Sequence, residues 1–323
     1  MNKYLAMFFD NYGLYEIHQK RSKQAHFRCN LSNPLPLDEL GTVFSDFQIP
    51  QITFKKQRQH NNYIVGRYSY KSDIQSNFTC NNYAIGQYYL NEEPSNTNIV
   101  ILHGWRMTQP KRVEKIFLPK FLKQGYNIYF PTLPFHNERT PQGSFNGELM
   151  ISSDIDRTLL STRQIVLELR ALINYLKTKE NSKVVLIGLS LGGQITNLMG
   201  VIENQIDLLI SIFYANNLAL SVWDTIPGKF IKKDFEDHNF TYEQLQRYWA
   251  IIEPSNFKPV VPRDKILLFS ALYDQYIDRK DSDRLWENWE RPARILYPCG
   301  HSGIVFNRGK LAKDISLFIR NNI

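Results

Sequence analysis

The residues best suited to chemistry are a serine and the glycines on either side of it, Gly188, Ser190 and Gly192. They follow an apolar, β-branched run that begins after Lys183, and a segment that can form a helix comes next. Glycine is expected at both flanking positions because a side chain there would block a sharp turn from strand to helix. A serine at the apex of such a turn has a strained backbone, and strain of this kind marks functional sites. We therefore predict that Ser190 is a nucleophile; the alternative is an ordinary turn in which the pattern arose by chance.

A serine hydroxyl is a weak nucleophile unless a base accepts its proton and a third group orients that base. His301 is the candidate base. It comes directly after the apolar residues 295–297, in a segment with a glycine before it and a glycine two residues after it. These glycines would let the chain bring the imidazole over the edge of a sheet. The alternative is an ordinary surface or core histidine.

The candidate acid is Asp274, which lies a few residues after the apolar run at 265–270. Asp278 is the second choice. Asp281 and Asp283 are further rivals, but they fall progressively into a segment that has the pattern of a helix start, where acidic side chains act as caps.

The rest of the chain from residue 98 onward alternates between short apolar runs and longer amphipathic segments. We predict strands at residues 99–102, 126–130, 184–187, 206–214, 265–270 and 295–297, and helices at 113–123, 154–178, 192–203 and 311–320. This alternation predicts an α/β fold, with a mostly parallel sheet that is covered by helices on both faces. The loops after its strands are the expected place for function, and Ser190, Asp274 and His301 all fall there.

A polar, proline-containing stretch at 91–98 divides the chain. We predict an N-terminal extension at 1–94 and a catalytic domain at 95–323. Within the extension, residues 62–72 and 82–90 have strand-like runs that can pair as an antiparallel hairpin on the core. The first fifty residues carry a short helical signal, and we interpret them as a decoration of uncertain shape.

An insertion at about 215–262 separates two predicted strands. It combines charged residues with many aromatic ones, namely Trp223, Phe230, Phe235, Phe240, Tyr242, Tyr248 and Trp249. This composition is too aromatic for a bare linker. We predict a helical cap over the site; the alternative is a segment that packs on the sheet edge.

The order Ser190, Asp274, His301 along the chain resembles that of the α/β-hydrolase superfamily, over about residues 95–323. The resemblance implies a serine hydrolase in which His301 deprotonates Ser190, Asp274 orients His301, and water releases the acyl group from Ser190. It implies carboxylesterase-like activity on a small or medium acyl ester. Thioesterase, amidase, peptidase and acyltransferase or lyase activities use related sites and stay open, as does a non-catalytic binding protein.

The resemblance extends to the segment His103-Gly104-Trp105, which follows the first core strand. In this superfamily the residue after such a pair donates a backbone N–H to an oxyanion hole. That role would fall to Trp105, with Leu191 as the second donor. His103 resembles the superfamily's structural histidine rather than its base.

The segment 131–150 departs from the superfamily's usual glycine-rich loop, because it is long, rich in turn-forming residues and charged. His136, Glu138 and Arg139 could bind a polar group of the substrate or brace the cap. Arg106, beside the expected oxyanion loop, allows the same two interpretations.

The composition of the chain excludes several other classes of protein. Of 323 residues, 43% are hydrophobic and 22% charged, which is typical of a globular protein. The net charge of +8 raises the question of nucleic-acid binding. The basic clusters at 55–58 and 111–112 are short, however, and no nucleic-acid-binding motif is present. We expect a small-molecule acyl substrate and no nucleic-acid partner.

The sequence has no run of about 18 apolar residues that could span a membrane, and its N-terminal apolar run is too short for a secretory signal. Cys29, Cys80 and Cys299 cannot all pair, and their spacing matches no zinc site. We therefore expect a cytoplasmic enzyme without a metal or other cofactor. Nothing in the sequence specifies the oligomeric state.

Overall fold

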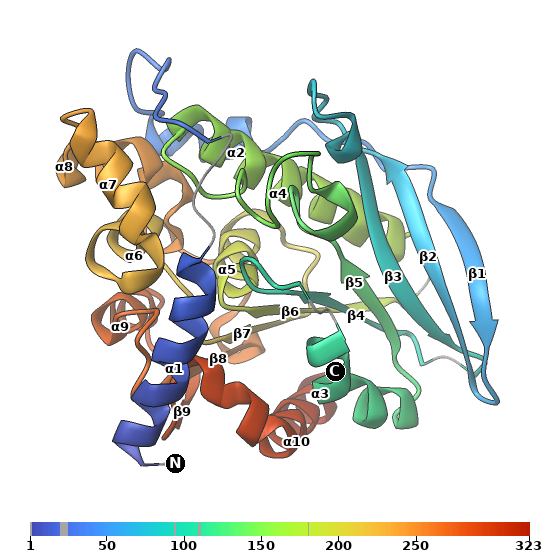
Figure 1. Ribbon diagram of the computed structural model, residues 1–323. Helices are drawn as coiled ribbons and strands as arrows, with labels where there is room; N and C mark the ends of the chain where they lie inside the picture. Colours follow the sequence, from blue (N-terminus) through green and yellow to red (C-terminus); the bar gives the residue numbers. More distant parts are fainter. Residues whose placement is uncertain (1, 20–24, 94, 109–110, 180) are drawn as a thin grey trace.

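The computed structural model describes residues 2–19, 25–93, 95–108, 111–179 and 181–323, and its centre is one nine-stranded sheet (Figure 1). The strand order is β1-β2-β3-β5-β4-β6-β7-β8-β9. The strands are β1 (Thr53–Gln59), β2 (Tyr63–Lys71), β3 (Tyr83–Asn91), β4 (Thr97–Leu102), β5 (Asn127–Pro131), β6 (Lys183–Leu189), β7 (Leu208–Ile212), β8 (Ile266–Ala271) and β9 (Ala293–Tyr297). From β5 to β9 all neighbours are parallel, which confirms the predicted mostly parallel α/β sheet.

Helices cover both faces of the parallel strands (Figure 1). The helices of the described residues are α1 (Lys3–His18), α2 (Leu40–Val43), α3 (Lys111–Lys123), α4 (Ile155–Lys177), α5 (Leu191–Ile202), α6 (Leu218–Asp224), α7 (Lys229–Asp237), α8 (Tyr242–Trp249), α9 (Arg279–Asn288) and α10 (Ile304–Asn322). Successive side chains of a strand point to opposite faces. Accordingly, Ile99 and Ile101 of β4 pack with α3 and α10, whereas Val100 and Leu102 pack with α4 and α5.

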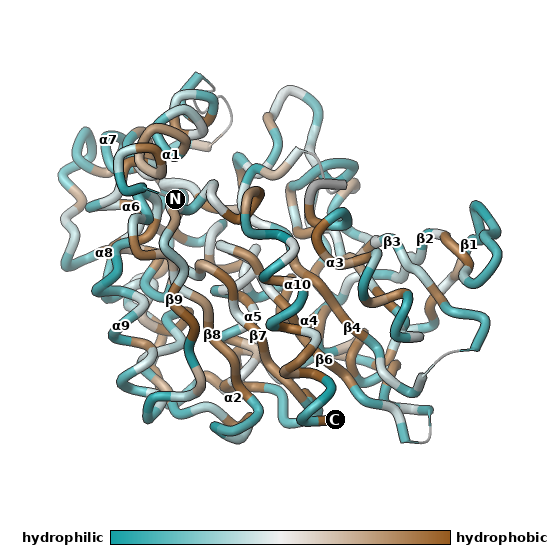
Figure 2. Tube along the Cα trace, turned by 90° about the horizontal axis from the view of Figure 1, so that it is seen from below, coloured by the Kyte–Doolittle hydropathy of each residue, from teal (hydrophilic) through white to brown (hydrophobic). Residues whose placement is uncertain are grey.

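The central strands are mainly apolar, as Figure 2 shows for β4, β6, β7 and β8. Every residue of β4, β7 and β8 is buried. Burial on both faces explains why these runs lack the alternation of a half-exposed strand. Because these strands are parallel, their carboxyl ends, and the loops that follow them, lie at one edge of the sheet.

The predicted antiparallel hairpin is confirmed: β2 and β3 pair antiparallel from Tyr63–Asn91 to Lys71–Tyr83, and β3 joins the core sheet through β5. The structure adds a strand, β1, at the outer edge. All its residues are exposed, and it holds the basic cluster Lys55, Lys56 and Arg58. Charged side chains on an edge strand oppose pairing with another chain, which accounts for this cluster.

Helix α1 begins at a capping residue, Asn2, whose side chain accepts hydrogen bonds from the backbone of Tyr4 and Leu5. Its buried residues, Ala6, Asp10 and Leu14, are four apart and so lie on one face. This face packs against the 3-10 turn His301–Gly303. The N-terminal segment is therefore packed against the loop after β9.

The segment between β7 and β8 is helical, as predicted, and contains α6, α7 and α8 (Figure 1). Phe235 and Trp249 are buried in the core cluster that also holds residues of α4 and α5.

Cys29, Cys80 and Cys299 carry free thiols. Among the residues that the structure describes, no helix is both long and apolar enough to cross a bilayer.

Candidate functional site

Ser190 lies between β6 and α5 with a backbone φ of 55°, in the left-handed region that a serine rarely adopts. The flanking glycines allow this turn. A Cβ at Gly188 would lie 2.1 Å from the carbonyl oxygen of Gly192, and a Cβ at Gly192 would lie 2.6 Å from the carbonyl oxygen of Leu102. The backbone N–H of Ser190 donates to the carbonyl of Ile212 at 2.9 Å, which fixes the turn to β7.

The structure brings Ser190, His301 and Asp274 into one row of hydrogen bonds. The Ser190 Oγ lies 2.9 Å from His301 Nε2, and His301 Nδ1 lies 2.8 Å from Asp274 Oδ2. Since the carboxylate accepts, Nδ1 carries the proton and Nε2 is free to accept from the serine hydroxyl. The other carboxylate oxygen of Asp274 accepts the backbone N–H groups of Tyr276 and Ile277 at 2.8 and 3.0 Å, so that the acid is held in place.

The rival carboxylates have other partners. Asp278 caps α9 by accepting the backbone N–H of Lys280. Asp281 is buried and accepts the backbone N–H groups of Asn216 and Asn217, and burial raises its pKa to about 6 despite these bonds. Asp283 forms an ion pair with Arg294. These contacts leave Asp274 as the carboxylate on His301.

The surroundings of His301 favour its charged form. Burial lowers the pKa of the imidazole, but the charge and hydrogen bond of Asp274, with the charge of Asp10, outweigh it and raise the pKa above its ordinary value. The ring of Tyr276 stacks on the imidazole, with centroids 4.5 Å apart and planes 11° apart. This packing fixes the ring orientation, and the two carboxylates stabilise an imidazolium.

Asp10 of α1 is a residue of the site that the sequence did not indicate. Its side chain is fully buried and accepts three backbone N–H groups, those of His301 at 2.8 Å, Ser302 at 2.8 Å and Gln275 at 3.1 Å. Burial raises the pKa of this carboxyl, while the N–H bonds of Ser302 and His301 oppose the rise. One side chain thus joins the loop of the base to the loop of the acid.

Trp105 and Leu191 line the same cavity as Ser190. Leu191 is the first residue of α5, and N–H groups in the first turn of a helix have no acceptor within that helix. The Trp105 side chain donates from Nε1 to the carbonyl of Gly147 at 2.8 Å, which fixes this loop.

Two cavities meet at Ser190 and His301. The smaller, of about 180 Å³, lies beneath α6 and the turn Ile226–Gly228, and its walls include Leu218, Val222 and Ile277. The larger, of about 580 Å³, lies between α3 and α10 and is lined by apolar side chains, with Lys115 and Arg308 also among its lining residues. Both volumes are mainly apolar with few polar groups, as binding sites for organic molecules are.

His103 and His136 are buried side by side, with ring centroids 5.0 Å apart. The His103 Nε2 accepts the backbone N–H of Leu133, and the His136 Nε2 accepts that of Arg106. Burial lowers the pKa of His103 to about 4 and that of His136 well below its ordinary value. Both are thus neutral at pH 7. His136 is not among the residues that line the two cavities at Ser190, and its hydrogen bond to Arg106 holds the loop.

Arg139 is also fully buried, and it forms a two-pronged ion pair with Glu168 of α4 at 2.7 Å for each bond. It donates further to the carbonyls of Thr132 and Asn81. The guanidinium therefore ties the 131–150 loop to α4, and Arg139 is not among the residues that line the two cavities at Ser190.

Replacing Arg139 with Ala should lower the free energy of unfolding by about 3–5 kcal/mol, because Glu168 would remain buried without a counter-charge. The double variant Arg139→Met, Glu168→Met should regain most of this loss. Urea denaturation of the three proteins measures it. A loss below about 1 kcal/mol for Arg139→Ala would show that the pair does not hold the loop.

Arg106 has a backbone φ of 56° and its guanidinium lies over the rings of Trp105 and Phe145, at 4.2 and 4.4 Å from their centroids. It donates to the carbonyl of Ile17 at the end of α1. Burial lowers its pKa to about 10. Arg106 lines a separate cavity of about 240 Å³ and is not among the residues that line the cavities at Ser190. Its hydrogen bond to Ile17 holds the end of α1 against this loop.

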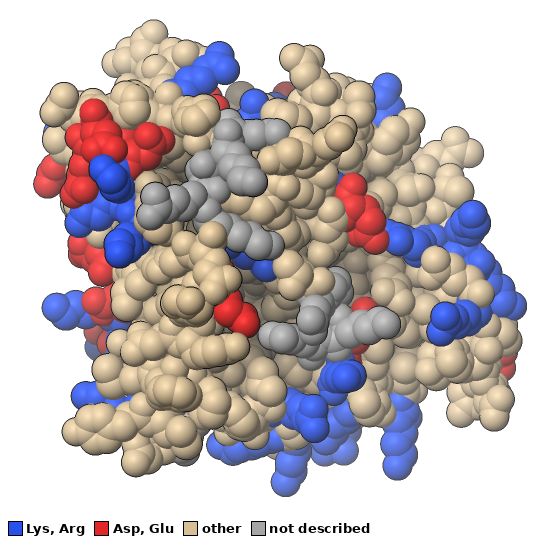
Figure 3. All heavy atoms as spheres, in the orientation of Figure 1, with Lys and Arg blue, Asp and Glu red and all other residues tan. Residues whose placement is uncertain are grey.

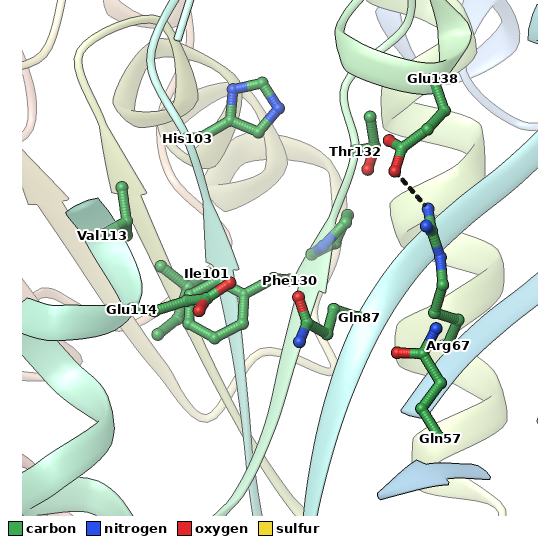
Figure 4. A pocket seen from close by; sticks show the side chains of 11 residues that line it. Gln57, Arg67, Gln87, Ile101, His103, Val113, Glu114, Phe130, Thr132 and Glu138 are labelled. Carbon is green, nitrogen blue, oxygen red and sulfur yellow. Dashed lines mark hydrogen bonds and ion pairs between the residues drawn. The ribbon is translucent and has the colours of Figure 1, made fainter. Parts of the chain in front are cut away.

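Glu138 points toward Arg67 of β2 and pairs with it at 2.7 Å (Figure 4). The two residues line a small cavity of about 100 Å³ together with Gln87 and Glu114. Across the described ranges, His, Cys, Asp and Glu side chains do not gather into groups of three or more that could hold a metal ion.

Comparison with known proteins supports the identification of the fold. The model of the Alpha/beta hydrolase family matches residues 99–311. The uncharacterized protein YdjC of Bacillus subtilis is 54% identical over 115 residues, which are 36% of this chain and 99% of YdjC. The uncharacterized protein Rv2627c of Mycobacterium tuberculosis is 28% identical over 217 residues, and these cover 65% of this chain and 51% of Rv2627c. The chain thus spans about half the length of this mycobacterial relative.

Among solved structures, the acetyl xylan esterase from Paenibacillus sp. R4 aligns with a TM-score of 0.67 at 14% identity, covering 96% of this chain and 99% of that one. Acetyl xylan esterase 1 from Thermoanaerobacterium sp. JW/SL YS485 aligns with a TM-score of 0.66 at 15% identity, covering 95% and 98%. At these identities the likeness concerns the fold alone.

Proposed function

Because the chain belongs to the alpha/beta hydrolase family, we propose that it is a serine hydrolase that cleaves carboxylic esters of small or medium acyl groups. The observation that carries this proposal is the row of hydrogen bonds from Ser190 through His301 to Asp274. It begins at a serine with a left-handed backbone and lies where two apolar cavities meet. A nucleophile, a base and a group that orients the base are what acyl transfer needs.

In the proposed reaction the Ser190 Oγ attacks the ester carbonyl carbon while its proton moves to His301 Nε2. The imidazolium is stabilised by Asp274 and then donates the proton to the departing alcohol. A water molecule, deprotonated by the same nitrogen, attacks the acyl-enzyme; the bond to the Ser190 Oγ breaks, the proton on Nε2 returns to this oxygen, and the acid is released. The raised pKa of His301 fits this cycle, because the charged form must be accessible in both steps.

The negative charge that develops on the carbonyl oxygen needs hydrogen-bond donors. The backbone N–H groups of Trp105 and Leu191 are the proposed donors, since both residues line the smaller cavity together with Ser190. Removal of one such donor costs about 3–4 kcal/mol of transition-state stabilisation in a well-studied protease. We assign the acyl group to this cavity, and its volume of about 180 Å³ favours short chains.

Pre-steady-state hydrolysis of nitrophenyl acetate by the full-length protein tests the proposal. An acyl-enzyme intermediate that is hydrolysed more slowly than it forms predicts a burst of nitrophenol equal to the enzyme concentration, followed by a slower steady rate. The corresponding thioester serves as a second substrate. If the steady rate with the thioester were far higher than with a matched alcohol ester, the ester assignment would give way to a thioesterase.

Replacing Ser221 with Phe in α6 should shorten the acyl chains that the protein accepts, because Ser221 lines the smaller cavity. We expect kcat/KM for butyryl and longer esters to fall by about tenfold or more relative to the acetyl ester. Val305→Trp is the matched control, since Val305 lines only the larger cavity. An unchanged chain-length preference in Ser221→Phe would contradict the assignment of the acyl group.

Replacing Asp10 with Asn should reduce kcat by about 10²-fold with a small change in KM, because an amide cannot accept all three N–H groups and the His301 loop would move. The pH profile of kcat/KM distinguishes an effect of Asp10 on His301 from a purely structural role of Asp10. Since the charge of Asp10 raises the pKa of His301, its loss should move the acidic limb of kcat/KM to lower pH.

Glu16→Gln is the control for Asp10→Asn, because it removes a carboxylate from the exposed side of the same helix. It should leave kcat and the pH profile unchanged. An Asp10→Asn variant that is destabilised but has the normal kcat and acidic limb would reduce Asp10 to a structural contact.

A further inference from the structure

The outer face of α1 exposes a row of large aromatic side chains. Tyr4, Phe8, Tyr12 and Tyr15 are three or four residues apart, so they share one side of the helix, and each is between 59% and 80% exposed. The opposite side holds the buried Asp10. Single exposed apolar residues are common, but a contiguous group of them marks a surface that binds something.

This row continues onto the start of α10. Phe306 is 61% exposed, and its ring centroid lies 4.9 Å from that of Phe9 in α1. Val305, beside it, is 50% exposed and lines the larger cavity at Ser190. We call the side chains of Tyr4, Phe8, Tyr12, Tyr15, Val305 and Phe306 the aromatic face; it reaches from the outside of α1 to the mouth of the cavity.

A second surface, which we call the basic face, adjoins the first along α10. It consists of the exposed cations of α3 and α10, namely Lys115, Lys123, Arg308, Lys310, Lys313 and Arg320. Among the side chains of these two helices that the structure describes, no Asp or Glu is exposed: Glu114 is buried, and Asp314 is half-buried and accepts from the Tyr297 hydroxyl. Figure 3 shows Lys and Arg atoms along the lower edge of the molecule, below the largely uncharged surface over α1.

The mouth of the larger cavity lies where the two faces meet. Lys115 of α3 and Arg308 of α10 line the cavity together with Val305, while its inner wall is apolar and includes Met107, Ile116 and Ile304. A ligand that enters here passes cations at the opening and then an apolar channel that ends at Ser190.

We propose that the aromatic and basic faces dock on an anionic lipid surface and that the larger cavity draws its substrate from it. Tyrosine and phenylalanine side chains enter the boundary between headgroups and acyl chains, and lysine and arginine are attracted to anionic headgroups. A protein partner would bury the aromatic face without requiring cations of one sign beside it. The lipid surface accounts for both faces and for the cavity that opens between them.

The proposal also narrows the substrate class, and this part rests on the proposed ester hydrolysis. The substrate is an amphiphilic ester whose apolar chain occupies the larger cavity and whose anionic group lies between Lys115 and Arg308. The short acyl group that is transferred to Ser190 then occupies the smaller cavity.

Co-sedimentation with vesicles tests the docking apart from the chemistry, using the full-length Ser190→Ala variant. We expect binding to phosphatidylcholine vesicles that contain about 30% phosphatidylglycerol, little binding to pure phosphatidylcholine, and release at about 0.5 M salt. The double variant Phe8→Ser, Tyr12→Ser should bind at least about tenfold more weakly while hydrolysing a soluble ester at the normal rate. Tyr83→Ser, which removes an exposed aromatic from the start of β3, is the matched control and should bind normally.

A second double variant, Lys115→Gln, Arg308→Gln, tests the contribution of the cations and should also weaken binding to the anionic vesicles. Absence of binding to both kinds of vesicle, or equal binding to both, would overturn the proposal. So would self-association in sedimentation velocity that Phe8→Ser, Tyr12→Ser abolishes, because the aromatic face would then be an interface between copies of the chain. Vesicle binding without any esterase activity in the wild type would leave the docking in place and overturn the proposed function.

Discussion

Ser190→Ala should lower kcat for nitrophenyl acetate by about 10⁶-fold, the scale seen when the nucleophile of a serine protease is removed. The hydroxyl is the only group in the proposed reaction that forms a bond to the substrate, so no neighbouring side chain can replace it. Single-turnover hydrolysis with the enzyme in excess measures the residual rate without interference from product release.

A double variant sharpens this test. Since Ser190 and His301 act as a unit, the variant Ser190→Ala, His301→Ala should be no slower than either single variant. Thermal unfolding should be nearly unchanged in Ser190→Ala, because the backbone conformation of the turn does not depend on the hydroxyl. Activity within tenfold of wild type in Ser190→Ala would mean that the hydrolysis takes place elsewhere.

Asp274→Asn should lower kcat by about 10⁴-fold, the largest expected effect outside the nucleophile and base. The amide can donate to His301 Nδ1, which would then carry no proton, and the proton would move to Nε2, the nitrogen that must accept from Ser190. The two oxygen-to-backbone bonds at Tyr276 and Ile277 can persist, so the loop should stay folded.

Asp278→Asn is the matched control for Asp274→Asn. Asp278 caps α9, and asparagine is as good a cap as aspartate, so both the activity and the stability should change little. A pH profile of kcat/KM for Asp274→Asn should show the acidic limb at lower pH, because the charge that raises the pKa of His301 is lost. If Asp278→Asn were the slower enzyme, the acid would have to be reassigned.

Much of this site could be predicted because its signals are local. Three adjacent features of the sequence predict the turn at Ser190, namely an apolar strand, two glycines and a helix. The structure has β6 and α5 at the predicted places. His301 and Asp274 could be placed because both follow short apolar strands, and loops after parallel strands meet at one edge of the sheet.

Asp10 could not be found in this way. Its burial depends on where α1 docks, and the docking surface is formed by loops almost 300 residues further along the chain. The local sequence around it shows an aromatic-rich helix whose apolar residues face both sides, so the pattern does not indicate which side is buried. In the sequence, the one feature that points to Asp10 is that it is an acidic residue among apolar ones.

The 131–150 loop shows a different limit. Charged residues in a turn-rich segment are normally solvated, and this made substrate contacts for His136 and Arg139 plausible. Arg139 is instead buried because Glu168, on a helix that begins after the loop, supplies its counter-charge. Pairing of this kind depends on the tertiary fold and leaves no periodic pattern in the sequence.

The predicted secondary structure differs from the observed one where a glycine or charged residues interrupt the hydrophobic pattern. Helix α10 begins at Ile304, seven residues before the predicted start, because Gly309 lies within it. An added Cβ at Gly309 would meet nothing within 4 Å, so this glycine is tolerated on the surface and does not end the helix. Strand β1 was missed because its residues are exposed and polar, without the alternation that marks a half-buried strand.

The most direct measurement of the central claim is the mass of the intact protein after reaction with a fluorophosphonate, followed by peptide mapping. Activation of Ser190 by His301 predicts one adduct per chain, carried by the peptide that contains Ser190. The adduct should be absent in Ser190→Ala and should form far more slowly in His301→Ala. No adduct on the wild-type protein, or an adduct that persists in Ser190→Ala, would contradict the assignment of Ser190 as the nucleophile.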